Sequence, residues 1–390
     1  MEILVTAGLT ALFLFALAVE RARLEKLRKR VPLRVCVTGT RGKSTVTRLV
    51  ASILRESGRR VLAKTTGSKP VLILPDGGER EVERPGPPSV LEQKRVLALA
   101  SRLGAEAVVA EMMSVRPECL AVESGRIFKP GLLLLTNVRL DHEEEMGSTK
   151  ADIAASLAAA ISEGAMVLVP EEEGYPVFEW LARERGAGHR TIPRGRASGS
   201  LFPENERLAL AAAAALGIDE ATARRGLERA KADFGSLAVF TLASPLTGKT
   251  WRFISAFAAN EPESSSRALA SLDSRHPGWP PFRIALFALR PDRGGRTRQW
   301  LRAFEDGFFA GFSRLVFIGE GARAAVRACR RRRRTGIEVT AVEFRQPRDI
   351  MDRLWPLADG EAVVVGLGNI VGLGAALVET WSAMEKRPGC

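Results

Sequence analysis

The fold of this chain follows from the stretch Leu33-Arg34-Val35-Cys36-Val37-Thr38-Gly39-Thr40-Arg41-Gly42-Lys43-Ser44-Thr45. A short apolar run ends there in a turn bracketed by two glycines, and an amphipathic helical pattern follows it. In such a strand–turn–helix unit, the backbone N–H groups of the turn and of the helix N-terminus face an anion. Lys43 can neutralise the charge of β- and γ-phosphates, and Ser44 can offer its hydroxyl to Mg²⁺. Although Val37 stands where the full pattern has its first glycine, the stretch predicts a shortened phosphate-binding loop rather than a plain strand-to-helix turn.

The length and composition of the chain limit the number of domains and the kinds of site that it can contain. The chain has 390 residues, 46% of them hydrophobic, which is enough for two or three domains with separate cores. It contains three histidines and no CxxC pair, which argues against a histidine-rich metal site. Its four cysteines are widely spaced, as expected for reduced thiols in a cytoplasmic body: Cys36, Cys119, Cys329 and Cys390.

The N-terminus carries the pattern of a membrane anchor. Residues 3–19 hold no charge and would span roughly 26 Å as a helix, which is at the short end for a membrane span. A secretory signal would place positive charge before the apolar run, whereas here the only early charge is Glu2. Six basic residues follow between positions 21 and 30, so the positive-inside rule predicts a cytoplasmic body. We expect an anchor over 1–20, crossing the cell membrane once, and a basic juxtamembrane linker over 21–33; a buried N-terminal helix is the alternative.

The formal net charge of +13 has two evident sources. The juxtamembrane cluster suits anionic lipid headgroups. The second source is the run from Arg330 to Arg334, which we interpret as a solvated helix end. Contact with a polyanion or an acidic partner is the alternative interpretation of that run.

Apolar runs alternate with helical patterns along most of the chain. In the first part we expect strands at 60–63, 105–110, 131–136 and 165–169 and helices at 90–103, 151–161, 206–216 and 220–230. Residues 71–74 and 79–82 flank Asp76-Gly77-Gly78 and predict a hairpin. The alternation begins afresh after residues 231–236, with strands at 251–256, 283–288, 314–318 and 362–365. We therefore predict an α/β protein with a doubly wound, mostly parallel sheet over 34–234 and a smaller α/β domain over 235–390.

Polar segments follow three of the expected strands. The phosphate loop follows the first strand, Glu111 ends a buried strand, and Asn137, Asp141 and His142 follow another. Open α/β sheets place ligand chemistry at the carboxyl ends of their strands. A lone histidine after a strand is usually structural, but beside Glu111 in such a sheet His142 is a candidate Mg²⁺ ligand.

Several segments with these features occur along the chain in a fixed order: 38–49, 64–67, 92–94, 111–115, 136–149, Asn205, 257–265, 290–299 and 366–370. In these segments the chain resembles the Mur ligase superfamily, and most closely the ligase subunits of poly-γ-glutamate synthases of the PgsB/CapB type. An N-terminal hydrophobic helix also belongs to that subfamily. The resemblance extends over about the whole chain, so residues 34–234 are similar to a Mur ligase ATP-binding domain and residues 235–390 to a C-terminal ligase domain.

The resemblance implies ATP-dependent amide ligation through an acyl phosphate, with release of ADP and phosphate. Lys43, Glu111, His142, Arg290 and Arg293 would then be the catalytic residues. Ser44, Glu111 and His142 would hold Mg²⁺. The nucleotide would be bound by Gly39, Thr40, Arg41, Gly42, Lys43, Ser44, Thr45, Asn137, Asn260 and Asp292. Surface salt bridges are the alternative role for Arg290 and Arg293.

The substrates implied by the resemblance are glutamate and poly-γ-glutamate, in the synthesis of a capsule or extracellular polymer. Small membrane subunits of the same synthase are the implied partners. One alternative is a Mur- or folylpolyglutamate-type ligase with another acceptor; no domain for a UDP-sugar substrate is visible before Arg34. The other is a P-loop ATPase coupled to membrane transport, against which stands the lack of a hydrophobic run ending in a Walker-B aspartate. No nucleic-acid motif is evident, so we do not expect nucleic acid as a partner.

One position departs from the pattern of these relatives. Many Mur ligases and folylpolyglutamate synthases carry a carbamylated lysine that bridges to the second Mg²⁺. Counted from Asp141 and His142, its place falls near Leu157, and the nearest lysine is Lys150. Either the second metal is held differently or Lys150 substitutes, and we do not expect carbamylation.

Overall fold

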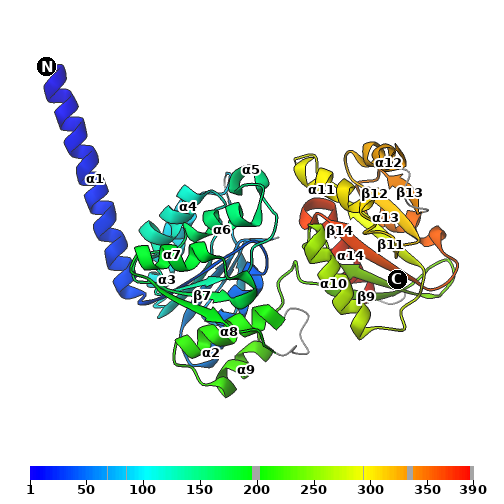
Figure 1. Ribbon diagram of the computed structural model, residues 1–390, viewed down its shortest axis with the longest axis horizontal. Coiled ribbons are helices and arrows are strands. Elements are labelled where there is room, and N and C mark those ends of the chain that lie inside the picture. Colours follow the sequence, from blue (N-terminus) through cyan, green and yellow to red (C-terminus); the bar gives the residue numbers. More distant parts are fainter. Residues whose placement is uncertain (68, 85, 196–202, 293, 332–336, 387–390) are drawn as a thin grey trace. The chain divides into compact units, whose positions relative to one another are not determined.

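The computed structural model describes the chain except residues 68, 85, 196–202, 293, 332–336 and 387–390. The chain divides into two compact units, Met1–Asp233 and Phe234–Cys390. Each unit contains one sheet with helices packed against it (Figure 1).

The sheet of the first unit has eight strands in the order β4-β3-β2-β5-β1-β6-β7-β8. The six strands from β2 to β8 in this order run parallel, and β3 and β4 form the predicted antiparallel hairpin at one edge. The predicted doubly wound, mostly parallel sheet is therefore confirmed. The strands are β1 (Leu33–Thr38), β2 (Val61–Thr65), β3 (Val71–Ile73), β4 (Glu79–Glu81), β5 (Ala107–Glu111), β6 (Leu132–Leu135), β7 (Met166–Pro170) and β8 (Gly188–Ile192).

The register of the central strands brings the three polar segments to one edge of the sheet. Strands β5 and β6 are buried along their whole length and, apart from Glu111 at the end of β5, are apolar throughout, because helices cover both faces of a parallel sheet. Val37 of β1 pairs with Glu111 of β5, and Thr38 pairs with Leu135 of β6. The phosphate loop, Glu111 and the segment after β6 therefore leave the sheet side by side.

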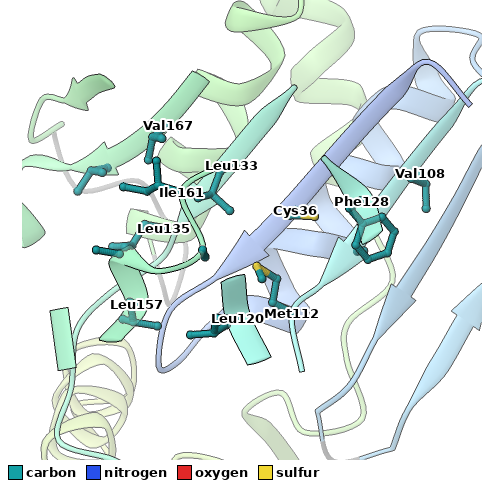
Figure 2. Packing of buried hydrophobic residues seen from close by; sticks show 14 of the residues in the cluster. Cys36, Val108, Met112, Leu120, Phe128, Leu133, Leu135, Leu157, Ile161 and Val167 are labelled. Atoms are coloured by element: carbon teal, nitrogen blue, oxygen red, sulfur yellow. The ribbon is translucent and has the colours of Figure 1, made fainter. Parts of the chain in front are cut away.

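Helices pack on both faces of this sheet. Helices α2, α8 and α9 cover one face, and α3, α4, α6 and α7 cover the other, whose apolar core is drawn in Figure 2. A capping box of Thr149 and Asp152 begins α6, and Asp219 caps α9. The helices after α1 are α2 (Lys43–Glu56), α3 (Leu91–Arg102), α4 (Pro117–Val122), the π-helix η1 (Glu123–Phe128), α5 (Glu143–Met146), α6 (Lys150–Ala158), the 3₁₀-helix η2 (Glu171–Glu173), α7 (Pro176–Glu184), α8 (Pro203–Ala215) and α9 (Glu220–Glu228).

Helix α1 (Glu2–Arg30) is long and apolar enough, by length and composition, to cross a membrane. Its first part extends away from the rest of the unit (Figure 1), with the apolar side chains of residues 3–19 exposed. Its last turns dock, because Leu24 and Leu27 pack against the core and Arg28 donates to the carbonyls of Arg126 (2.8 Å) and Ile127 (3.1 Å). The basic segment that we expected as a linker is thus helical up to Arg30.

The second unit has a six-stranded sheet in the order β13-β12-β11-β14-β10-β9, in which only β9 is antiparallel to its neighbour. Its core is aromatic, with Trp251, Phe253, Trp355 and Trp381 in contact. The elements are β9 (Ala238–Ala243), β10 (Thr250–Ser255), α10 (Pro262–Arg275), β11 (Arg283–Ala288), α11 (Gly294–Glu305), β12 (Arg314–Ile318), α12 (Ala322–Arg331), β13 (Glu338–Val342), α13 (Pro347–Leu354), η3 (Trp355–Leu357), β14 (Ala362–Gly368), η4 (Ile370–Gly374) and α14 (Ala375–Glu385).

The arginine run lies at the end of α12. Arg330 and Arg331 are exposed in its last turn, as expected of a solvated helix end. The remaining three arginines of the run, 332–334, lie outside the described residues.

Candidate active site

At two positions of the phosphate loop there is no space for a side chain larger than that of glycine. Gly39 has a φ of +126° and Gly42 a φ of +78°, a range that side chains rarely adopt. A Cβ on Gly39 would lie 2.2 Å from Oγ1 of Thr136, and one on Gly42 would lie 2.6 Å from Oδ1 of Asn205. The two glycines bracket the turn because backbone and neighbouring side chains already fill the space beside them.

Lys43, Ser44 and Thr45 form the first turn of α2. The Nζ atom of Lys43 curls back over the loop and donates to the carbonyls of Gly39 (2.7 Å) and Thr40 (3.2 Å). Burial lowers the pKa of Lys43 below the usual range of lysine, and the charge of Glu111 opposes this shift. The ammonium group is therefore buried beside the loop, where an anion would compensate its charge.

Asn137 braces the loop from the end of β6. Its Oδ1 accepts hydrogen bonds from Oγ1 of Thr40 (2.8 Å) and the backbone N–H of Arg41 (2.9 Å). Its Nδ2 donates to the carbonyl of Arg41 at 3.1 Å. These bonds fix the loop conformation, while the predicted contact of Asn137 with a nucleotide stays a prediction.

Glu111 joins three segments that are distant in sequence. Its Oε2 accepts hydrogen bonds from Oγ of Ser44 (2.7 Å) and from the backbone N–H of Thr66 (2.7 Å). The carboxyl end of β5 therefore meets both the phosphate loop and the glycine-containing segment after β2. Sequence reasoning marked Ser44 and Glu111, but it could not show that Thr66 contacts the same carboxylate.

The donor set at this point suits Mg²⁺. A hydroxyl and a carboxylate are oxygen ligands of the kind that hard cations take. Within the described parts of the chain, no group of three or more His, Cys, Asp and Glu side chains could hold a metal. Mg²⁺ usually keeps several waters and binds substrate phosphates, so the oxygens of Ser44 and Glu111 beside a phosphate loop fit it.

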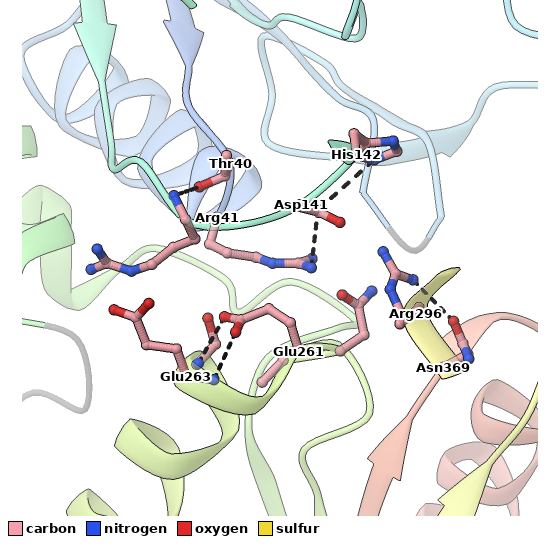
Figure 3. Close-up of polar contacts among 12 residues, drawn as sticks. Thr40, Arg41, Asp141, His142, Glu261, Glu263, Arg296 and Asn369 are labelled. Atoms are coloured by element: carbon pink, nitrogen blue, oxygen red, sulfur yellow. Dashed lines mark hydrogen bonds and ion pairs between the residues drawn. The ribbon is translucent and has the colours of Figure 1, made fainter. Parts of the chain in front are cut away.

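His142 is linked to the phosphate loop through Asp141 (Figure 3). Asp141 Oδ2 lies 3.0 Å from NH2 of Arg41 and 3.8 Å from Nε2 of His142. The Nδ1 atom of His142 lies 3.8 Å from Oε2 of Glu145. The backbone of His142 has a φ of +52°, which is uncommon for a residue with a side chain and is found at functional sites. Its role as a metal ligand stays a prediction.

A buried polar network lies behind Glu111. Lys64 is fully buried and donates to Oε2 of Glu92 at 3.0 Å. The other carboxylate oxygen of Glu92, Oε1, pairs with Nε of Arg84 at 2.7 Å. Next to it, the buried Glu123 of η1 accepts from the side chain of Gln93 and from backbone N–H groups of the segment after β5. The network fixes the carbonyl of Glu111 and the backbone that follows it.

We expect Glu92→Gln to destabilise the protein by about 1.5–3 kcal/mol at neutral pH, because Lys64 loses its charged acceptor. Burial alone would raise the pKa of Glu92, but bonds from Arg84 and Lys64 lower it overall. A carboxylate with a lowered folded-state pKa contributes stability above its unfolded-state pKa and loses it as pH falls through the folded-state pKa. Urea unfolding of both proteins should therefore show a stability difference at pH 7 that shrinks towards pH 3.

The control for this prediction is Glu163→Gln, which changes an exposed glutamate of the same unit. We expect that variant to stay within about 0.5 kcal/mol of the parent. A stability difference for Glu92→Gln that is the same at both pH values would contradict the ion-pair explanation.

Of the predicted residues of the second unit, Arg290 and Asp292 follow β11, and Asn260 lies in the segment after β10. After β11, the guanidinium of Arg290 forms two bonds with the carboxylate of Asp292 (2.9 and 2.6 Å). The carbonyl of Asn260 accepts from the indole of Trp300 at 3.2 Å. Arg293 lies outside the described residues. Their roles towards a nucleotide stay predictions.

The segment after β14 is tied to α11 by a further contact. Arg296 donates to Oδ1 of Asn369 at 3.0 Å, and Asn369 donates to the carbonyl of Ala288 at 3.1 Å (Figure 3). This contact joins two of the sequence segments that carry the resemblance.

Sequence reasoning did not assign a site role to Asp141, Asn205 or Glu123. Asp141 and Asn205 lie in segments that carry the resemblance, so their positions there could have indicated a role. Glu123 lies in a short π-helix with no sequence signal of its own. Leu157, the expected place of a carbamylated lysine, packs in the apolar core of the first unit.

Comparison with known proteins assigns both units. The Mur ligase middle domain family matches residues 37–193, and the poly-γ-glutamate synthase CapB C-terminal domain family matches residues 242–384. PGA synthase CapB of Bacillus subtilis (strain 168) is 31% identical over 371 residues, which cover 92% of this chain and 93% of that protein. The chain belongs to the CapB family of poly-γ-glutamate synthases. A second CapB relative, the capsule biosynthesis protein CapB of Bacillus anthracis, is 31% identical over 394 residues, covering 98% of this chain and 83% of its own.

Solved structures confirm the fold that the CapB family shares with other ligases. The bifunctional folylpolyglutamate synthase/dihydrofolate synthase of Yersinia pestis CO92 matches with a TM-score of 0.67 at 16% identity, over 94% of this chain and 92% of its own. E. coli FolC in complex with DHPP and ADP matches with a TM-score of 0.64 at 18% identity, over 94% and 92%. MurF of Acinetobacter baumannii matches with a TM-score of 0.65 at 16% identity, over 91% and 79%.

The family membership confirms the predicted resemblance and the predicted class of reaction. As a member of the CapB family with a Mur ligase middle domain, the chain is an ATP-dependent amide ligase. The phosphate loop of the first unit is the part of the structure suited to the triphosphate.

Proposed function

We propose that this enzyme elongates poly-γ-glutamate by coupling glutamate to the growing polymer at the expense of ATP. The observation that carries the proposal is the bond of Glu111 to Ser44 of the phosphate loop and to Thr66 (both 2.7 Å), in a member of the CapB family. This junction gathers a carboxylate, a loop hydroxyl and a backbone N–H beside the phosphate loop, which supports binding of the γ-phosphate there. Poly-γ-glutamate as product follows from the names of the CapB relatives.

The proposed chemistry has two steps. A carboxylate oxygen of the substrate first attacks the γ-phosphorus of ATP, the bond to the β,γ-bridging oxygen breaks, and ADP leaves. The amine of the second substrate then attacks the acyl carbon of the acyl phosphate, inorganic phosphate leaves, and the amine loses a proton. Both steps depend mainly on positioning and on the neutralisation of phosphate charge.

The first unit supplies residues for both needs. Lys43, already buried beside the loop carbonyls, would neutralise charge on the β- and γ-phosphates. Ser44, Glu111 and His142 would hold Mg²⁺, which supplies positive charge against the phosphate oxygens. Asn137 fixes the backbone of the loop, because its Oδ1 accepts the N–H of Arg41 and its Nδ2 donates to the carbonyl of the same residue.

The second unit would contribute further contacts. We infer that Asn260 and Asp292 contact the nucleotide and that Arg290 and Arg293 neutralise charge on the transferred phosphoryl group. The support is their place in the CapB-type motifs of the chain, directly after β10 and β11.

We further infer that α1 anchors the enzyme in the cell membrane as a single span with the catalytic body in the cytoplasm. The exposed apolar run of residues 3–19 and the basic residues after it support this topology. Small membrane subunits of the same synthase are the proposed partners, which the polymer would need if it is to leave the cell.

The test of the proposed function is the acceptor dependence of ATP hydrolysis by the full chain in detergent or membranes. We expect ADP and phosphate to be released in a fixed ratio to γ-glutamyl bonds, and only when glutamate or its polymer is present. Release of AMP and pyrophosphate would exclude an acyl phosphate. ATP hydrolysis that proceeds without any acceptor would favour a transport ATPase. Coupling to a different acceptor in a screen would show that this acceptor, and not glutamate or its polymer, is the substrate.

A further inference from the structure

A separate pocket of about 230 Å³ lies against the later turns of α2 in the first unit. It is bounded by α2, by the β3–β4 hairpin and by the segment that follows α9. From α2 it is lined by Arg48, Ser52 and Arg55, which lie three to four residues apart and so share one face of the helix. None of these residues belongs to the phosphate loop or to the site around Glu111.

The two carboxylates of the pocket are already engaged by arginines. Glu79 of the hairpin pairs with NH1 of Arg48 at 2.7 Å. Glu56 pairs with Arg225 at 2.9 Å and also with Arg229. Both carboxylates are thus bonded directly to other arginines, and any further cation of the pocket interacts with Glu79 only at longer range.

Two such cations line the pocket. Arg55 and Lys231 form no ion pair and no side-chain hydrogen bond with any described residue. The NH1 atom of Arg55 is buried and without a hydrogen-bond partner. A buried donor left unsatisfied costs free energy, and an anion in the pocket would remove that cost.

The electrostatic environment of Arg55 agrees with this description. Burial lowers the pKa of the Arg55 guanidinium, the charge of Glu79 opposes the shift, and the charge of Arg48 adds to it. The pocket thus holds a partly desolvated positive charge that nearby carboxylates compensate only in part.

We propose that this pocket binds the carboxylate of a glutamyl group, with the guanidinium of Arg55 and the ammonium of Lys231 as its recognition groups. A guanidinium matches a carboxylate in planar, two-bond geometry. The volume of 230 Å³ lies below the range of about 300–1,000 Å³ for pockets of drug-sized ligands, so it suits a single small anionic group. The choice of a glutamyl carboxylate over other anions rests on the proposed function, under which free glutamate and the polymer are the abundant carboxylates.

A series of contacts leads from Arg48 of the pocket towards the phosphate loop. Arg48 also bonds Asp233, the last residue of the first unit, at 3.2 Å. A Cβ on Gly67 would lie 3.6 Å from Oδ2 of Asp233 and 2.6 Å from Oγ of Ser44. Asp233 therefore connects Arg48, which lines the pocket, with Gly67 and Ser44 at the phosphate loop.

The experiment compares binding to the full chain and to Arg55→Gln in detergent, without ATP and at constant ionic strength. The probes are free glutamate, a γ-linked glutamyl oligomer and inorganic phosphate. We expect Arg55→Gln to weaken binding of a glutamyl probe at least tenfold. The matched control is Arg59→Gln, which removes the same charge from an exposed position just after α2 and should change affinity less than twofold. Lys231→Gln changes an exposed side chain of the same pocket and should weaken binding severalfold even if Arg55→Gln fails to fold.

The probes separate the two sources of the carboxylate. A loss confined to the oligomer assigns the pocket to the polymer, and a loss shared by free glutamate assigns it to the monomer as well; both support the proposal. Unchanged binding of all glutamyl probes in Arg55→Gln and Lys231→Gln overturns it. Binding that depends on Arg55 for phosphate alone also overturns it.

Ligation by the parent enzyme is measured in parallel, so that the two proposals can fail separately. If glutamyl binding depends on Arg55 but the enzyme forms no γ-glutamyl bonds, the proposed function is wrong and the proposed pocket stands. If the enzyme forms γ-glutamyl bonds but Arg55→Gln does not change its glutamyl binding, the proposed function stands and the proposed pocket is wrong.

Discussion

Lys43→Ala is expected to lower kcat for ATP-dependent ligation about 10³-fold or more while the protein stays folded. The Nζ atom of Lys43 is held 2.7 Å from the carbonyl of Gly39 and 3.2 Å from that of Thr40, at the mouth of the turn whose N–H groups face an anion. A fixed positive charge at that position acts on the charge that develops during phosphoryl transfer, and losses of this size follow the removal of such groups.

The fold should tolerate this substitution because it removes a charge rather than exposing one. Burial already lowers the pKa of Lys43, so the folded state gains little from the ammonium group in the absence of a phosphate. The measurements are γ-glutamyl bond formation, affinity for a fluorescent ATP analogue, and thermal unfolding by circular dichroism. Lys249→Ala, an exposed lysine of the second unit, is the control and should keep full activity. If Lys43→Ala ligates at a tenth of the parent rate or faster, Lys43 is not required for phosphoryl transfer and the prediction is wrong.

Glu111→Gln is expected to lower kcat at least 100-fold and to raise the Mg²⁺ concentration needed for half-maximal rate. The carboxylate accepts two hydrogen bonds of 2.7 Å, from Ser44 and from Thr66. Glutamine keeps the size of the side chain and one acceptor oxygen, so the junction can persist, but the negative charge that would face a cation is lost. Initial rates measured across a Mg²⁺ titration at saturating ATP separate a loss of metal affinity from a loss of kcat.

The control for Glu111 comes from the same strand segment. Glu106 lies just before β5, is exposed, and accepts a hydrogen bond from the backbone of Arg60 at 3.0 Å, far along the strand from the phosphate loop. Glu106→Gln should leave both kcat and the Mg²⁺ requirement within about twofold of the parent. A Glu111→Gln enzyme with unchanged kcat and unchanged Mg²⁺ dependence would show that this carboxylate only positions Thr66.

Much of the fold could be predicted because its signals are local. A strand buried on both faces must be a continuous apolar run, as β6 is with four leucines, and a turn with positive φ must hold glycine, as at Gly39 and Gly42. Elements without such signals were missed. Strand β8, for example, has the sequence Gly-His-Arg-Thr-Ile, lies at a sheet edge and is half exposed.

The candidate site also has parts that could be predicted from the sequence and parts that could not. The sequence by itself determined the phosphate loop, the carboxylate at the end of β5 and the family to which the chain belongs, because each is a local pattern or an ordered set of them. Only the tertiary structure decided that Ser44 and Thr66 share the carboxylate of Glu111, that Asn137 fixes the loop, and that NH1 of Arg55 has no hydrogen-bond partner among the described residues. The physical reason is that these contacts join residues on different strands and helices, so they depend on strand register and helix packing, which no single stretch of sequence specifies.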